Sequence, residues 1–92
     1  MLVASTPADG PSPEADCLIS LSYFELLAQS MGLGTVWCGL AKWGMEIVPE
    51  IRIALGIPEE HLLGYVMMFG NPAVRYHRTV QRGPVNLRRY AP

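Results

Sequence analysis

The eight-residue run from Gly32 to Gly39, GLGTVWCG, most constrains how this chain folds. Gly32 or Gly34 can end a helix in the left-handed conformation that other residues avoid. The β-branched and aromatic residues between the glycines predict a short strand over Thr35–Cys38. The run is therefore a tight helix-to-strand junction. Two readings of its glycines fit: they cap and turn the chain, or they let a flat ligand approach the backbone amides.

The segment before this junction predicts a strand over Met1–Ser5, a loop, and one long helix that ends near Met31. Ser12 suits the N-cap, Pro13 the first helical position, and the acidic Glu14 the positive end of the helix dipole. Apolar residues cover more than one stripe of this helix. We therefore expect it to be buried on most sides.

Residues 40–55 return to helical spacing, and Pro49 divides them into two short helices, the second of which begins near Val48. Leu62–Phe69, LLGYVMMF, is apolar on both faces and predicts a strand at the centre of a sheet. The basic tail that follows is irregular, and Pro84–Leu87 is a candidate edge strand. The fold class is α+β, with the order strand, long buried helix, strand, short helices, central strand and tail.

The high apolar content of the sequence bears on whether the chain contacts another chain. Half of the 92 residues are apolar and 16% are charged, against about 25% in ordinary domains. The excess apolar surface fits a subunit interface or contact with missing chain; a small domain rich in apolar residues is the plain alternative. The longest apolar segment contains too many polar residues to cross a bilayer, so no membrane is expected.

Charge is distributed unevenly. All eight acidic residues lie at or before Glu60, whereas five arginines and no acid follow His61. Such a tail favours an anionic partner; solvated arginines, or arginines paired with the earlier acids, fit equally well. A nucleic-acid partner is not expected, because the tail contains only two aromatic residues and the whole chain has a net charge of −1.

Few residues suit a chemical role. The chain has no nucleophile elbow, Walker loop, HExxH or GxGxxG motif, so no catalytic residue is assigned. Cys17 and Cys38 form no metal-ligand pair and no disulfide framework, so no metal is expected and a reduced, cytoplasmic setting is the default. Cys17 reads as an inert core thiol; Cys38 either packs or lines a pocket. Arg78 and Arg82 follow the central strand and suit a phosphate, or else face solvent.

Three stretches together resemble the C-terminal half of the nitroreductase-like flavoproteins. The first is PEADCLISLSYFELLAQSMGLGTVWCG, the second VPEIRIALGIPEEHLLGYVMMFGNPA, and the third YHRTVQRGP. Their order and spacing cover nearly the whole chain. The resemblance implies a partial three-layer α+β fold, a homodimer, and FMN bound at the dimer interface. It also implies hydride transfer from NAD(P)H through the flavin to a small nitroaromatic or quinone-like acceptor.

The resemblance also implies roles for individual residues. The backbone of Cys38, Gly39, Leu40 and Ala41 would face the flavin ring. Arg82 matches the arginine that binds the FMN phosphate, and Arg78 is a weaker match for a second contact. The family often has a basic residue two positions before Arg82, where this chain has Val80.

One departure bears on completeness. The family's N-terminal half carries an arginine- and serine-rich segment that grips FMN, and nothing like it occurs here. We therefore expect residues 1–92 to be a single partial domain, a truncated reading frame or fragment that alone binds FMN poorly or not at all. The alternative is a non-enzymatic assembly or binding subunit that a partner chain, such as a complementing N-terminal half, completes.

Overall fold

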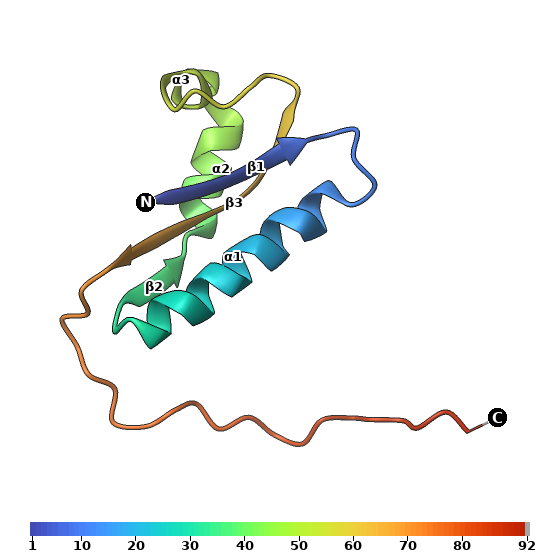
Figure 1. Ribbon diagram of the computed structural model, residues 1–92, viewed down its shortest axis with the longest axis vertical. Helices are drawn as coiled ribbons and strands as arrows, with labels where there is room; N and C mark the ends of the chain where they lie inside the picture. Colours follow the sequence, from blue (N-terminus) through green and yellow to red (C-terminus); the bar gives the residue numbers. More distant parts are fainter. Residues whose placement is uncertain (92) are drawn as a thin grey trace.

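The computed structural model describes residues 1–91, which form three strands, three helices and a long tail (Figure 1). The order is β1 (Leu2–Pro7), α1 (Pro13–Ser30), β2 (Gly34–Trp37), α2 (Gly39–Ile47), α3 (Pro49–Ala54) and β3 (His61–Gly70). This order agrees with the sequence prediction, with strand boundaries that differ by one or two residues. The division of the second helical segment at Pro49 is confirmed.

The ends of α1 follow two different rules. At the C-terminal end, Gly32 takes a φ of 75°, and the Leu33 N–H donates to the Ala28 carbonyl at 2.9 Å. This is a Schellman motif, so the predicted left-handed glycine is confirmed at Gly32 rather than Gly34. At the N-terminal end, Ser12 occupies the N-cap position but its side chain makes no capping hydrogen bond. The capping role expected of that side chain is wrong.

The sheet is antiparallel with the order β1-β3-β2, so the predicted central position of β3 is confirmed. The register pairs Val3 with Val66 and Val36 with Met68. A bulge interrupts the β1–β3 pairing, because Ala4 faces Tyr65 whereas Ser5 faces Leu63. Gly64 is the extra residue of that bulge.

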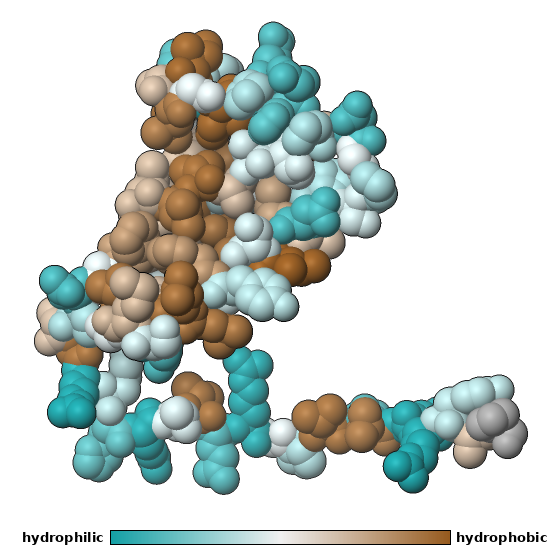
Figure 2. Space-filling model, viewed as in Figure 1, coloured by the Kyte–Doolittle hydropathy of each residue, from teal (hydrophilic) through white to brown (hydrophobic). Residues whose placement is uncertain are grey.

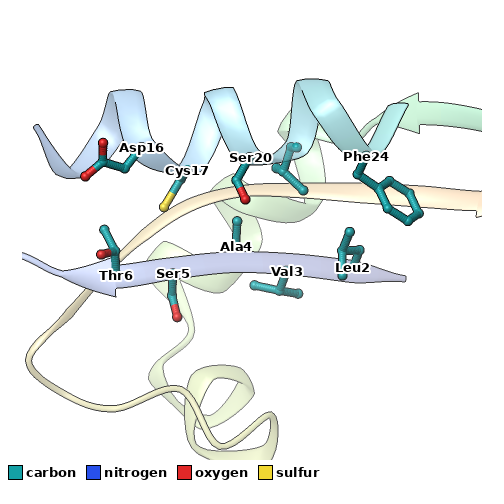
Figure 3. Close-up of a pocket in the computed structure, with 10 residues that line it drawn as sticks. Leu2, Val3, Ala4, Ser5, Thr6, Asp16, Cys17, Ser20 and Phe24 are labelled. Carbon is teal, nitrogen blue, oxygen red and sulfur yellow. The ribbon is translucent and has the colours of Figure 1, made fainter. Parts of the chain in front are cut away.

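Helices cover both faces of this sheet, which confirms the three-layer α+β arrangement. α1 lies across one face, while α2 and α3 lie on the other (Figures 1 and 3). Between α2 and the sheet, the buried side chains of Met45, Leu63 and Val66 form the main core cluster. On the opposite face, buried Cys17 lies against Gly64.

The expectation that α1 is buried on most sides is wrong for the single chain. Only Cys17, Leu21 and Ala28 of this helix are buried, because one narrow stripe contacts the sheet. Large apolar side chains elsewhere on the helix are exposed, including Tyr23 at 72% and Leu26 at 69%. Figure 2 shows brown, apolar residues gathered over the folded part of the molecule. The apolar excess of the sequence is therefore at the surface.

Residues 71–91 contain no helix or strand and extend away from the sheet (Figure 1). The candidate edge strand over residues 84–87 is therefore not formed. This tail raises the radius of gyration to 16.7 Å, compared with about 12 Å for a compact chain of this length. Among the described residues, no helix is long and apolar enough to cross a membrane.

Candidate functional site

The predicted ligand-facing residues are the N-cap and the first turn of α2, directly after β2, and are here called the Cys38–Ala41 turn. The Cys38 N–H donates to the Val66 carbonyl at 2.8 Å, which fixes the turn against the central strand. The Cys38 carbonyl accepts from the Lys42 N–H at 3.1 Å and starts the hydrogen-bond ladder of α2. The turn is thus held at one end by the sheet and at the other by the helix.

The first turn of α2 lacks a side-chain cap. Cys38 occupies the N-cap position and makes no side-chain hydrogen bond there. The N–H groups at the start of a helix have no carbonyl partner within the helix, and they lie at the positive end of its dipole. Gly39 and Leu40 are exposed, and Ala41 is half-buried. The turn therefore presents backbone donors to an electron-rich ligand.

The Cys38 side chain serves the core rather than this donor surface. It is half-buried and packs against the cluster of Met45, Leu63 and Val66. Of the two readings that the sequence left open, the structure supports packing. Any contact with a ligand in this turn would come from the backbone.

A group of side chains that sequence reasoning missed lies next to the Cys38–Ala41 turn. The Trp37 indole N–H donates to the Glu25 carboxylate of α1. The Trp37 and Tyr65 rings meet edge to face, with centroids 5.4 Å apart and an interplanar angle of 70°. A Cβ atom at Gly39 would lie 2.8 Å from the Tyr65 hydroxyl oxygen. No local pattern signals these contacts, because they join residues distant in the chain.

The two predicted phosphate-binding arginines lie elsewhere. Arg78 and Arg82 are exposed in the tail and make no ion pair within residues 1–91. The single chain does not bring them together with the Cys38–Ala41 turn (Figure 1). Their role stays a prediction.

A separate groove of about 550 Å³ runs between β1 and α1. Figure 3 shows Leu2, Ala4 and Thr6 pointing from β1 toward the helix, while Cys17 points back toward the strand. Its polar lining includes the carboxylate of Asp16 and several hydroxyl groups. None of the predicted site residues lines this groove.

The Cys17 thiol at this groove is unsuited to nucleophilic chemistry. Burial raises its pKa above the ordinary value of 9.0, and the charge of Asp16 adds to the increase, while a hydrogen bond with the Gly64 backbone opposes it. A thiol with a raised pKa stays protonated at neutral pH and reacts slowly. The prediction of an inert core thiol at Cys17 agrees with its burial.

Comparison with known proteins identifies the family of the chain. Residues 1–71 match the model of the nitroreductase family, which covers β1 to β3 and includes the Cys38–Ala41 turn. No curated protein and no solved structure matches the chain significantly. The family match extends over more than half of the 92 residues. The chain therefore belongs to the nitroreductase family.

Proposed function

We propose that this chain is an FMN-dependent oxidoreductase of nitroreductase type whose Cys38–Ala41 turn lies against the flavin ring. The observation that carries the proposal is the uncapped first turn of α2, exposed at Gly39 and Leu40. The chemistry that bound FMN supplies is hydride uptake from NAD(P)H and onward reduction of a nitroaromatic or quinone-like acceptor. In this proposal the flavin carries the reaction and the protein binds and orients it, which agrees with the lack of a catalytic side-chain motif in the sequence.

The residues of the turn fit a flavin ring on two grounds. Backbone N–H groups at the positive end of α2 stabilise negative charge, which accumulates on a flavin when it is reduced. The Cys38 side chain points into the core, so it leaves the backbone of the turn accessible. In this proposal an amide of the turn donates near the flavin N5 position.

The phosphate of FMN requires a second part of the site. Arg82, with Arg78 as a weaker candidate, supplies a planar guanidinium suited to phosphate oxygens. The tail of one chain does not reach its own Cys38–Ala41 turn (Figure 1). We therefore propose that the tail of a second copy completes the site, as in a homodimer.

The exposed apolar face of α1 supports this homodimer. Ile19, Tyr23 and Leu26 are each more than half exposed and lie on one side of the helix, around a shallow depression. Burying such a face in a subunit interface removes its apolar surface from water.

The two free cysteines are consistent with the cytoplasmic setting that we include in the proposal.

The test is reconstitution of the purified chain with FMN. Because a single chain is expected to bind FMN poorly, we expect a bound-flavin absorbance spectrum, and oxidation of NADH or NADPH with a nitroaromatic acceptor, only at protein concentrations at which the homodimer forms. We also expect loss of FMN affinity in Arg82→Ala. Arg89→Ala is a matched control, because it removes another exposed tail arginine. Failure of the wild-type chain to retain FMN at any protein concentration would overturn the proposal.

A second candidate function is a non-enzymatic assembly subunit completed by a different chain. The separation of the tail arginines from the turn in the single chain favours it as much as it favours a homodimer. Copurification with a separate chain that supplies the other part of the flavin site would support this candidate. Flavin retention by the pure chain would exclude it.

A further inference from the structure

Three side chains from three different elements converge behind the Cys38–Ala41 turn. Glu25 comes from α1, Trp37 from the end of β2, and Tyr65 from the middle of β3. We infer that these three are positioning residues, which set the direction of the backbone N–H groups in the turn. The inference rests on the proposed function, since the turn is taken to face the flavin ring.

Glu25 fixes the orientation of the indole. It is half-buried and accepts a hydrogen bond from the Trp37 ring N–H. A hydrogen bond to a charged group contributes more than a neutral one, and partial burial protects it from competition with water. Trp37 directly precedes the turn, so fixing its side chain also limits rotation of the backbone that enters Cys38.

Trp37 in turn orients Tyr65. Their edge-to-face contact, at 5.4 Å between centroids, is a favoured geometry for an aromatic pair. The Lys42 ammonium lies 6.0 Å from the centroid of the Tyr65 ring and adds a contact from α2 itself. The ring is thus held by a neighbour on β2 and by a cation one helical turn after Gly39.

Tyr65 then sets the position of Gly39. A Cβ atom at residue 39 would lie 2.8 Å from the Tyr65 hydroxyl oxygen but 3.8 Å from Cζ, which is an ordinary contact distance. Removal of the hydroxyl oxygen therefore makes room for a methyl group at residue 39. The fit between Gly39 and Tyr65 is specific to one atom, so it can be tested by a compensating pair of substitutions.

The experiment compares Gly39→Ala, Tyr65→Phe and the double variant. We expect Gly39→Ala to shift the amide NMR resonances of Leu40 and Ala41 in the free chain and to weaken FMN binding by about tenfold to a hundredfold. The double variant should recover both. The midpoint potential of bound FMN should change in Gly39→Ala and return in the double variant, because it reports amide placement near the ring.

Gly44→Ala is the matched control, since it places a methyl group on the same helix with no atom within 4 Å. It should leave the amide resonances of the turn and the FMN affinity unchanged with or without Tyr65→Phe. Equal effects of Gly39→Ala in both backgrounds would overturn the inference, because they would show that Tyr65 does not set the turn.

Trp37→Phe provides an independent test if Gly39→Ala fails to fold. This variant keeps an aromatic ring but loses the N–H that donates to Glu25. We expect the same amide resonances to shift, whereas unchanged resonances would contradict the role of Glu25. If the wild-type chain binds no FMN while the amide shifts follow this pattern, the proposed function fails and the positioning of the turn stands.

Discussion

At Gly64 the central strand lies close against α1. A Cβ atom there would lie 2.1 Å from the Cys17 Cβ and 3.2 Å from the Ala4 carbonyl oxygen, so neither a side chain nor the backbone can easily move aside. We expect Gly64→Ala to lower the free energy of unfolding by about 1–3 kcal/mol, the typical cost of overpacking a core. Urea denaturation measures this change.

Gly70→Ala is the control for this substitution, because a Cβ atom at the end of the same strand meets nothing within 4 Å. It should change stability by much less than Gly64→Ala. Equal losses in the two variants would show that the approach of α1 to β3 is not as close as described.

The raised pKa of Cys17 gives stability a pH dependence. Below the ordinary pKa of 9.0 the thiol is protonated in both folded and unfolded chains; above it the unfolded chain loses the proton first. The contribution of this group is therefore complete below about pH 9 and is lost as the pH rises through the higher folded pKa. We expect the urea midpoint of the wild type to fall more between pH 8 and pH 10 than that of Cys17→Ala.

Cys38→Ala serves as the comparison, since it removes the other thiol and should keep the alkaline loss. A thiol reagent at pH 8 should also modify Cys38 before Cys17, which is only 3% exposed. Identical alkaline behaviour of Cys17→Ala and the wild type would contradict this account of Cys17.

At the scale of elements, α1 begins without the capping interaction that its sequence indicates. Replacement of a capping serine by alanine usually costs about 1 kcal/mol. Because the Ser12 side chain makes no such bond, we expect Ser12→Ala to change the free energy of unfolding by only a few tenths of a kcal/mol. Thermal unfolding at a fixed protein concentration tests this, and a loss near 1 kcal/mol would show that the hydroxyl caps the helix in solution.

The elements also show what local sequence can and cannot predict. A left-handed glycine after α1, at Gly32 or Gly34, and the division at Pro49 were predictable, because each depends on the backbone of one residue. The burial of α1 was not, because an apolar pattern identifies side chains such as Leu26 without saying what covers them. The contact between Gly39 and Tyr65 could not be predicted from local sequence for a similar reason, since the two residues meet only after β3 and α2 pack together.

At the scale of the whole molecule, the tail accounts for the extended shape. Residues 77–91 are exposed along their whole length. We expect a chain that ends at Tyr76 to keep the urea midpoint of the full chain at concentrations where both are monomeric. Small-angle X-ray scattering should show its radius of gyration falling from 16.7 Å toward about 11 Å. A lower midpoint would show that the tail folds back onto the sheet.

The proposed site combines a turn on the folded part of the chain with arginines on the tail. The place of the Cys38–Ala41 turn could be predicted from the residues around β2, because a helix N-terminus after a strand is a local feature, whereas its role toward a flavin ring comes from the family resemblance and stays a proposal. The phosphate half of the site could not be located, because the position of Arg82 depends on a tail that the folded part does not hold. The proposed edge strand over residues 84–87 failed for a related reason, since a strand needs a partner edge as well as suitable residues.

The position of β1 at the border of the sheet has a consequence for how this chain behaves when concentrated. In the part of the chain that the structure describes, no strand pairs with its outer edge, and Leu2–Pro7 contains no charged side chain. Natural sheets protect such borders with lysine, proline or a covering segment, because an open border templates aggregation. Here only Pro7, at the very end, has that effect. We therefore expect the concentrated chain to associate edge to edge through β1 unless another segment covers that border.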